Sequence, residues 1–411
     1  MSLTAWEKLY GAEPSERSFS LRFAGIIERA CKQAGQRVVI LVDEYDKPML
    51  QAIGNEELQR QFRNALKPFY GALKTMDGCI KFAFLTGVTK FGKVSVFSDL
   101  NNLDDISMRK DYVELCGVSD RELHDTLDAE LHEFADVRGV TYDKLCAELK
   151  ECYDGYHFTH NSIGMYNPFS LLNAFKYKEF GSYWFETGTP TYLVSLLKKH
   201  HYDLERMAHE ETDAQVLNSI DSESTNPIPV IYQSGYLTIK GYDEEFGIYR
   251  LGFPNREVEE GFVRFMLPYY ANVNKVESPF EIQKFVREVR SGDYDSFFRR
   301  LQSFFADTTY EVIRDQELHY ENVLFIVFKL VGFYTKVEYH TSEGRIDLVL
   351  QTDKFIYIME FKLNGSAEEA LRQIKDKHYA LPFATDGRKL FQIGVNFSAE
   401  TRNIEKWIVE A

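Results

Sequence analysis

Long apolar runs, a signal pattern and a cysteine framework are all absent from this sequence. A bilayer-spanning helix needs about 20 apolar residues, and no run approaches that length. The N-terminal Met1-Ser-Leu-Thr leads into charged sequence, so no secretory leader is expected. The cysteines are odd in number and scattered, which predicts neither a zinc site nor disulfides: Cys31, Cys79, Cys116, Cys146 and Cys152. This usage favours a reducing cytoplasm, and no membrane partner is expected.

A surplus of positive charge is also missing, because the formal net charge is −15. That value argues against a protein that coats nucleic acid non-specifically, since such binding depends on Lys and Arg at the phosphates. The acidic surplus is uneven: from Glu311 onward there are 16 Asp and Glu against 13 Lys and Arg. The charge argument against nucleic-acid binding is therefore weaker for the C-terminal part. Bound metal ions would also offset negative charge there.

The residues that are present are typical of a globular protein, with 44% hydrophobic and 27% charged residues. A length of 411 residues is enough for two or three domains. Val38–Val42 is a run of five aliphatic residues, typical of a strand buried on both faces of a parallel sheet. Residues 79–86 predict a second such strand, and residues 1–36 and 56–75 are expected to be helical.

Two further apolar runs, residues 346–350 and 355–363, predict strands that carry charged residues. Side chains alternate along a strand, so Glu360 and Lys362 share one face, about 6–7 Å apart. If the two strands pair, Asp347 can reach the same edge. Burying two carboxylates and an ammonium group is costly unless they are paired or bind a metal. A structural Glu–Lys pair is the simpler alternative.

The order of Asp347, a 12-residue gap and then Glu360-x-Lys362 resembles the PD-(D/E)xK nuclease superfamily. The segment that follows strengthens the resemblance. Ser366 begins a Ser-Ala-Glu-Glu capping box, which predicts the start of a helix. On that helix, Gln373 resembles the residue that supports the active site in many of these nucleases.

The resemblance implies a metal site with assigned roles. Asp347 and Glu360, with the backbone carbonyl of Phe361, would bind one or two Mg²⁺ or Mn²⁺ ions, which prefer oxygen ligands. Lys362 would position the attacking water or offset developing negative charge. Gln373 would orient Lys362 or the nucleophile.

Nucleases of this superfamily often place a glutamate on the helix before the catalytic sheet. Residues 315–331 predict such a helix, and Glu317 is the expected residue, with Glu321 as the alternative one turn later. An ordinary first turn, in which acidic residues interact favourably with the helix dipole, explains these residues equally well.

A second motif follows the first predicted strand. Asp43-Glu44 after Val38–Val42 is the Walker B pattern, in which Asp binds hydrated Mg²⁺ and Glu polarises water. Thr86, at the end of the neighbouring strand, occupies the place of a sensor residue. Together these segments resemble the AAA-ATPase-like domain that is fused to a PD-(D/E)xK nuclease domain in bacterial and archaeal proteins. The resemblance covers nearly the whole chain and includes residues 153–157, 166–170 and 184–190.

The P-loop of that family, G-x-x-x-x-G-K-[ST], is missing. The 42 residues before Asp43 contain no Gly-Lys-Ser/Thr. Because the P-loop amides and lysine bind the phosphates, Asp43 and Glu44 are expected to be a vestigial site without ATP as a cofactor or substrate. Truncation and natural loss of the P-loop both explain this departure.

The sequence as a whole predicts a multidomain α/β protein. Residues 1–200 are expected to form a truncated P-loop-ATPase-like α/β domain, and residues 201–275 a small helical, winged-helix-like module containing a hairpin. Residues 276–411 are expected to form a restriction-endonuclease-like α/β domain with a mixed central sheet. Phe397-Ser-Ala-Glu reads as a helix cap, which predicts a terminal helix ending near Trp407.

Two functions from different classes follow. The favoured expectation is a metal-dependent nuclease that acts on nucleic acid, with DNA as the expected substrate. The alternative is a non-catalytic module that binds nucleic acid or protein in a larger complex, since function depends on the site and not on the fold. The choice between DNA and RNA, sequence specificity and a homo-oligomeric state all stay open at this level.

Overall fold

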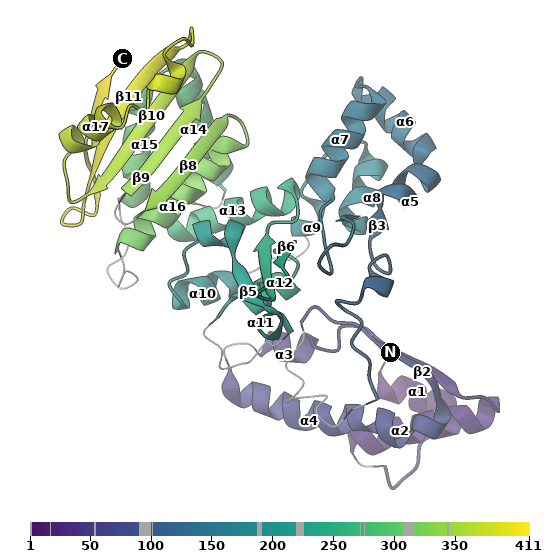
Figure 1. The fold of residues 1–411 in the computed structure, drawn as a ribbon. Coiled ribbons are helices and arrows are strands. Elements are labelled where there is room, and N and C mark those ends of the chain that lie inside the picture. Colours follow the sequence, from purple (N-terminus) through teal and green to yellow (C-terminus); the bar gives the residue numbers. More distant parts are fainter. Residues whose placement is uncertain are drawn as a thin grey trace. The chain divides into compact units, whose positions relative to one another are not determined.

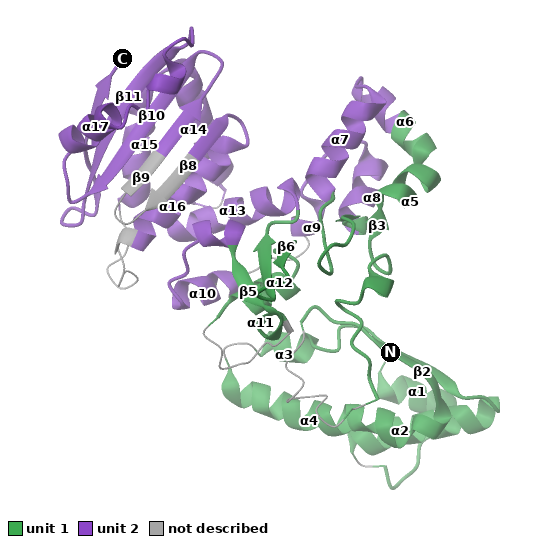
Figure 2. Ribbon diagram, viewed as in Figure 1, with its two compact units in different colours: residues 1–132, 154–168, 210–254 green, residues 133–153, 169–209, 255–411 purple. Residues whose placement is uncertain are grey.

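The computed structural model describes residues 2–411 apart from 17, 53–54, 90–99, 101, 187–190, 219–225, 272, 275, 307–315 and 343–344. The chain divides into two compact units, each built from separate segments (Figure 2). Unit 1 comprises residues 1–132, 154–168 and 210–254. Unit 2 comprises residues 133–153, 169–209 and 255–411.

The N-terminal part of unit 1 packs helices on a small parallel sheet (Figure 1). The described sheet pairs strand β1 (Val38–Val42) with β2 (Ile80–Leu85) in parallel, as the aliphatic runs predicted. The predicted burial of β1 on both faces is wrong, because Val39 is 55% and Leu41 is 72% exposed on the face away from Tyr70 and Leu73. Ile40, Val42 and Leu85 pack on Tyr70 and Leu73 of the long helix that follows. The predicted helix over 1–36 is two helices, and the accompanying helical elements are α1 (Leu3–Tyr10), α2 (Phe19–Ala34), α3 (Lys47–Gln51), α4 (Glu56–Thr75) and η1 (Asp77–Cys79).

The remainder of unit 1 contains two small antiparallel sheets. β3 (Val118–Ser119) pairs with β4 (Met165–Tyr166). The predicted hairpin is present as β6 (Thr238–Asp243) and β7 (Ile248–Gly252), and β5 (Glu211–Asp213) adds to its edge. The helices here are η2 (Lys110–Tyr112), α5 (Asp120–Thr126), α11 (Ala214–Asn218) and α12 (Ile228–Gln233).

The first part of unit 2 is helical. Its elements are α7 (Tyr142–Tyr153), α8 (Pro168–Tyr177), α9 (Tyr183–Glu186), α10 (Thr191–Lys199), η3 (Glu205–His209) and α13 (Arg256–Tyr270). α6 (Asp128–Arg138) begins in unit 1 and ends in unit 2. Among the described residues, every helix is too short or too polar to cross a membrane.

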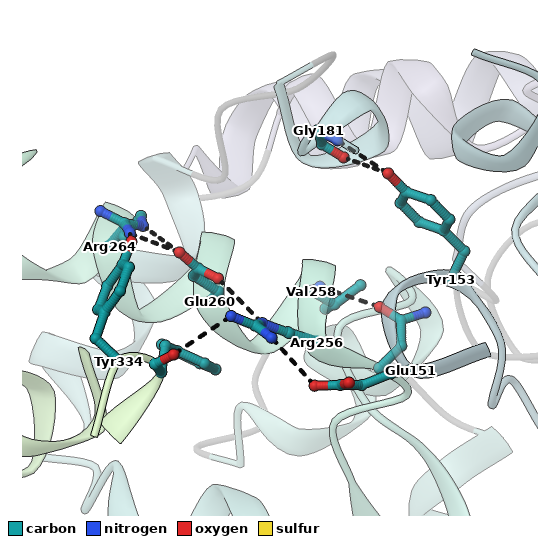
Figure 3. Close-up of polar contacts among 10 residues, drawn as sticks. Glu151, Tyr153, Gly181, Arg256, Val258, Glu260, Arg264 and Tyr334 are labelled. Carbon is teal, nitrogen blue, oxygen red and sulfur yellow. Dashed lines mark hydrogen bonds and ion pairs between the residues drawn. The ribbon is translucent and has the colours of Figure 1, made fainter. Parts of the chain in front are cut away.

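An arginine network ties α13 to both its neighbours in unit 2 (Figure 3). The Arg256 guanidinium lies 3.2 Å from Glu151 of α7 and 3.6 Å from Glu260, and it also donates to the backbone carbonyl of Phe333. Arg264 donates to Glu260 and to the Tyr334 hydroxyl. These contacts fix the turn that precedes the C-terminal sheet against the helical part of the unit.

The C-terminal part of unit 2 is a mixed sheet with strand order β12-β11-β10-β9-β8. β10 and β11 are parallel, and the other neighbours are antiparallel. The prediction of a C-terminal α/β domain with a mixed central sheet is confirmed. The strands are β8 (Lys336–Ser342), β9 (Arg345–Gln351), β10 (Phe355–Leu363), β11 (Lys389–Ser398) and β12 (Asn403–Glu410).

Helices cover both faces of this sheet (Figure 1). On one face, Leu371 and Ile374 of α17 (Ala367–Asp376) pack on Ile356 and Ile358 of β10. On the other face, the Tyr357 hydroxyl donates to the carbonyl of Val289. That face is covered by α14 (Ser278–Ser291), α15 (Tyr294–Phe305) and α16 (Gln316–Gly332), while η4 (Leu381–Phe383) follows α17.

The predicted terminal helix is wrong, because residues 403–410 form β12 and pair antiparallel with β11. Ser398 is the last residue of β11, and its hydroxyl accepts from the amide of Thr401 in a tight turn rather than capping a helix. Arg402 has φ 56°, which completes the reversal. Trp407 then stacks on Phe298 of α15, with ring centroids 5.4 Å apart. Packing of that ring on Phe298, together with the pairing to β11, favours a strand over the helix.

A half-buried histidine gives unit 2 a pH-dependent stability. His319 of α16 stacks on Tyr270 of α13, with ring centroids 6.4 Å apart. Burial, and then the charge of Lys198, lower the pKa of His319 to about 4. The unfolded chain takes up the proton near pH 6.5 while the folded chain does not, so stability falls as the pH drops from about 6.5 towards 4.

We expect the free energy of unfolding to fall by about 2 kcal/mol through this one group between pH 7 and pH 5. His319→Phe, which keeps a ring against Tyr270 and cannot titrate, should be less sensitive to pH by that amount. Urea unfolding of both proteins at the two pH values measures the difference. Equal pH dependence of the two proteins would show that His319 is protonated freely in the folded state.

Candidate active site

The register of the C-terminal sheet brings two acidic positions together. In the antiparallel pairing of β9 and β10, Asp347 lies directly opposite Glu360. Residues directly opposite in such a ladder share a face of the sheet, and their Cβ atoms are about 4.5–5.5 Å apart. The side chain of Asp347 lies outside the part that the structure describes. The backbone register thus places two carboxylate-bearing residues at one point of the sheet.

The Glu360 side chain is fully buried and ion-paired. Its Oε1 lies 3.2 Å from Nζ of Lys362, and the Glu360 side chain is 0% exposed whereas that of Lys362 is 22% exposed. Both lie on the α17 face, since Ile356 and Ile358 of the same strand pack on α17. A carboxylate in this position has lost its hydration, so it is stable only beside a positive charge. The apolar run of β10 enforces the burial, and Lys362 compensates for it.

Helix α17 covers the face of the sheet that carries Glu360 and Lys362. Its capping box is formed at Ser366 and Glu369, as the sequence predicted. The helix lies directly on β11 at Gly394, where an added Cβ would lie only 2.1 Å from the carbonyl oxygen of Ala367. Gly394 pairs with Glu360 in the parallel register, so the missing side chain lets α17 approach at the height of the carboxylate.

The other two predicted site residues, Gln373 and Glu317, lie on the helices that flank the sheet. Gln373 is half-buried on α17, and in the described part of the chain its side chain makes no hydrogen bond to Glu360 or Lys362. Glu317 is the second residue of α16, and its side chain lies outside the described part. Tyr320, one turn later, stacks on Phe397 of β11, so α16 begins at the end of the sheet where Lys362 lies.

The residue between the ion-paired side chains points the other way. Phe361 packs on Phe328 of α16 with ring centroids 6.0 Å apart, and it is 2% exposed. Its phenyl ring therefore belongs to the core under the sheet, and a metal ligand from this position can come only from its backbone carbonyl.

The donor set at this point fits a hard divalent cation. Two carboxylate-bearing positions face each other and a backbone carbonyl lies between Glu360 and Lys362, which is the oxygen-rich chemistry that Mg²⁺ prefers. Among the side chains that the structure describes, no group of three or more His, Cys, Asp and Glu could hold a metal. Asp347 is not among those side chains, so the fit rests on the register and on the chemistry of the residues.

The Walker B-like segment forms an ordered loop in unit 1. Asp43 accepts a hydrogen bond of 2.7 Å from the hydroxyl of Thr86, the predicted sensor position. Asp46 is buried and accepts from the amide and the hydroxyl of Thr89. Glu44 is exposed and pairs with Lys47 at 2.6 Å. These hydrogen bonds join the segment after β1 to the segment after β2, and the buried Asp46 carboxylate is one of the two acceptors.

Sequence reasoning missed three residues in these sites: Asp46, Gly394 and Asn396. Asp46 follows the Walker B pair and is expected in a loop, although the residue is 1% exposed. Asn396 lies directly across from Lys362 in β11. A sequence signal for Gly394 and Asn396 is the alternation of side chains along residues 392–396. It places both residues on the face that carries Leu390 and α17.

Comparisons with known proteins agree with the motifs. A family model described as predicted AAA-ATPase matches residues 1–97, and one described as the PD-(D/E)XK nuclease superfamily matches residues 315–407. A curated relative, the "Uncharacterized protein in vnfD 5'region" of Azotobacter chroococcum mcd 1, is 33% identical over 423 residues. That match covers 100% of this chain and 78% of the relative. No solved structure matches.

Proposed function

Because this chain belongs to the family that joins a predicted AAA-ATPase-like domain to a PD-(D/E)XK nuclease superfamily domain, we propose that it is a divalent-metal-dependent nuclease acting on DNA. One observation carries the proposal: Asp347 lies directly opposite Glu360 in the register, and Glu360 is fully buried beside Lys362. Such an arrangement is unfavourable in a purely structural core and useful at a metal site.

The residues have distinct roles in phosphodiester hydrolysis. Asp347, Glu360 and the carbonyl of Phe361 would bind Mg²⁺ or Mn²⁺. When bound, the ion supplies a water of lowered pKa and offsets the charge that develops on the phosphate. Lys362, with its side chain partly exposed, would orient that water and contact a phosphate oxygen.

Two further residues support this arrangement in the proposal. Glu317 would approach the ion from the first turn of α16, directly or through water. Gln373 would orient Lys362 or the nucleophile from α17, after a change of its side-chain rotamer. DNA is the proposed substrate, although the same groups could cleave RNA.

Metal removal tests the proposal directly. We expect cleavage of DNA in the presence of Mg²⁺ or Mn²⁺ and complete loss of cleavage after EDTA, because the proposed groups supply no water of lowered pKa without the ion. Labelled single-stranded DNA, duplex DNA and RNA in parallel assays identify the substrate. A protein that binds Mn²⁺ but cleaves none of the three would instead be a binding module.

For the N-terminal part, we propose that Asp43 and Glu44 are a vestigial Walker B pair. The Asp43–Thr86 hydrogen bond is present, but residues 1–42 contain no Gly-Lys-Ser/Thr that could bind phosphates. We expect no ATP hydrolysis above the rate without protein and no ATP binding in the micromolar range. Phosphate-release assays and calorimetric titration with MgATP measure both, and micromolar binding would contradict the proposal.

A further inference from the structure

Asn396 carries a buried acceptor beside the proposed site. This residue of β11 is 8% exposed, and its Nδ2 donates to Oε2 of Glu405 at 3.1 Å. Its Oδ1 is buried and accepts no hydrogen bond from the residues that the structure describes. Buried amide oxygens normally have a partner, so an open one indicates a place where a donor arrives.

The orientation of the Asn396 amide is fixed by chemistry. A carboxylate only accepts hydrogen bonds, so the nitrogen of the amide must face Glu405 and the oxygen must face away from it. Glu405 lies on β12, on one side of β11, and β10 lies on the other side. Oδ1 is therefore left on the side of β10, where Lys362 is the residue directly across from Asn396.

A β-bulge between β11 and β12 brings the Glu405 carboxylate to the Asn396 amide. The register between β11 and β12 pairs Asn396 with Lys406 and Phe397 with Ile404, so Glu405 is the extra residue. Its neighbour Lys406 pairs with Glu368 of α17, so the bulge turns two successive side chains towards the α17 face. Bulges commonly redirect a side chain next to an active site.

From these contacts we propose that Asn396 is a positioning residue that accepts a hydrogen bond from the Lys362 ammonium during the reaction. The inference rests on the proposed nuclease function. In this structure, Nζ of Lys362 is 3.2 Å from Glu360. Once the Glu360 carboxylate shares its charge with a bound cation, that ammonium is drawn less strongly to Glu360. The flexible stem of Lys362 and its three donors let it turn towards Oδ1 of Asn396 while it keeps a donor for the phosphate.

The role predicts a defect in turnover and not in substrate binding. Asn396→Leu keeps the volume of the side chain but removes the acceptor. We expect its kcat to fall about tenfold or more while KM stays within about twofold, because loss of one positioning hydrogen bond acts on the reacting geometry. Asn403→Leu is the matched control, since Asn403 begins β12 and donates to the carbonyl of Gln302 instead.

Two compensating substitutions distinguish a positioning role of Asn396 from a general disturbance of strand β11. In Asn396→Asp combined with Glu405→Gln, the glutamine donates to the new aspartate, and an acceptor still faces Lys362. We expect this double variant to regain most of the kcat that Asn396→Leu loses. No recovery in a folded double variant would contradict the proposal.

A spectroscopic measurement on the full chain decides the contact independently of cleavage. In protein labelled with ε-¹⁵N-lysine and assigned with Lys362→Arg, we expect Mg²⁺ to shift the Lys362 ammonium resonance. The shift should differ in Asn396→Leu, where the ammonium released from Glu360 has no amide oxygen to turn to, and should be kept in Asn403→Leu. An identical response of wild type and Asn396→Leu, or no response in wild type, would overturn the inference. If wild-type protein cleaves no nucleic acid, the proposed function fails, while this resonance still decides whether Lys362 turns to Asn396.

Discussion

Glu360→Gln is expected to lower Mg²⁺-dependent cleavage at least about 10³-fold while the protein stays folded. The substitution keeps the shape of the side chain and removes the anionic ligand. A bound cation contributes several kcal/mol of charge stabilisation in phosphoryl hydrolysis, and 10³-fold corresponds to about 4 kcal/mol. Initial rates at saturating Mg²⁺ with the preferred nucleic acid measure the loss.

The stability of this variant should change little. The Glu360 carboxylate has lost all its hydration and lies opposite another acidic position, so a neutral amide removes a desolvation cost. Lys362 loses its partner but stays partly hydrated. We therefore expect the free energy of unfolding to stay within about 1 kcal/mol of the wild-type value.

A matched control for Glu360 exists in the same domain. Glu368 of α17 is also ion-paired to a lysine, Lys406, but its side chain is 56% exposed. An exposed pair contributes about 0–1 kcal/mol, so Glu368→Gln should alter neither activity nor stability appreciably. If Glu360→Gln retained full activity, Glu360 would be a structural partner of Lys362 and the nuclease proposal would lose its metal ligand.

Gly394→Ala is expected to destabilise the C-terminal domain by about 3 kcal/mol, the upper part of the range for overpacked sites. The new methyl group would lie 2.1 Å from the carbonyl oxygen of Ala367 and 2.5 Å from the amide nitrogen of Leu371. Both are backbone atoms of α17, so no side-chain rotation relieves the overlap and the helix must move away from the sheet. Urea unfolding, with hydrogen exchange of the β10 and β11 amides, measures the effect.

The shift of α17 should also reduce cleavage, because the turn into this helix touches the candidate site. A Cβ at Gly365 would lie 3.0 Å from the Cβ of Lys362, which shows how closely that turn approaches. Gly387→Ala provides the control, since nothing lies within 4 Å of its added Cβ. Equal stability of the two alanine variants would show that α17 does not need its close approach at Gly394.

The N-terminal and C-terminal folds could be predicted in large part from short-range pattern. Val38–Val42 is a strand because β-branched and aliphatic residues favour extended backbone, although only one face of β1 is covered, and β10 over Phe355–Leu363 follows from the same preference. The helix after Ser366 follows from a capping box that acts within four residues. The order of Asp347, Glu360 and Lys362 was also visible, because strand periodicity alone puts the last two on one face.

The same local rules misjudged the C-terminal end. Phe397-Ser-Ala-Glu matches a helix cap in composition, but Ser398 ends β11 and the residues that follow pair with it. A cap signal is worth about 1 kcal/mol, which is less than the pairing of seven residues of β12 with β11 together with the packing of Trp407 on Phe298.

By itself, the sequence determined the strands that carry Asp347, Glu360 and Lys362 and the helix that follows Ser366, since those properties depend on neighbours a few positions away. Only the tertiary structure decided that Asp347 lies opposite Glu360 and that Gly394 admits α17. Tertiary structure also decided that a bulge at Glu405 places its carboxylate against Nδ2 of Asn396. Register and helix packing arise from contacts between residues far apart in the chain, where a shift of one residue would move each side chain to the other face.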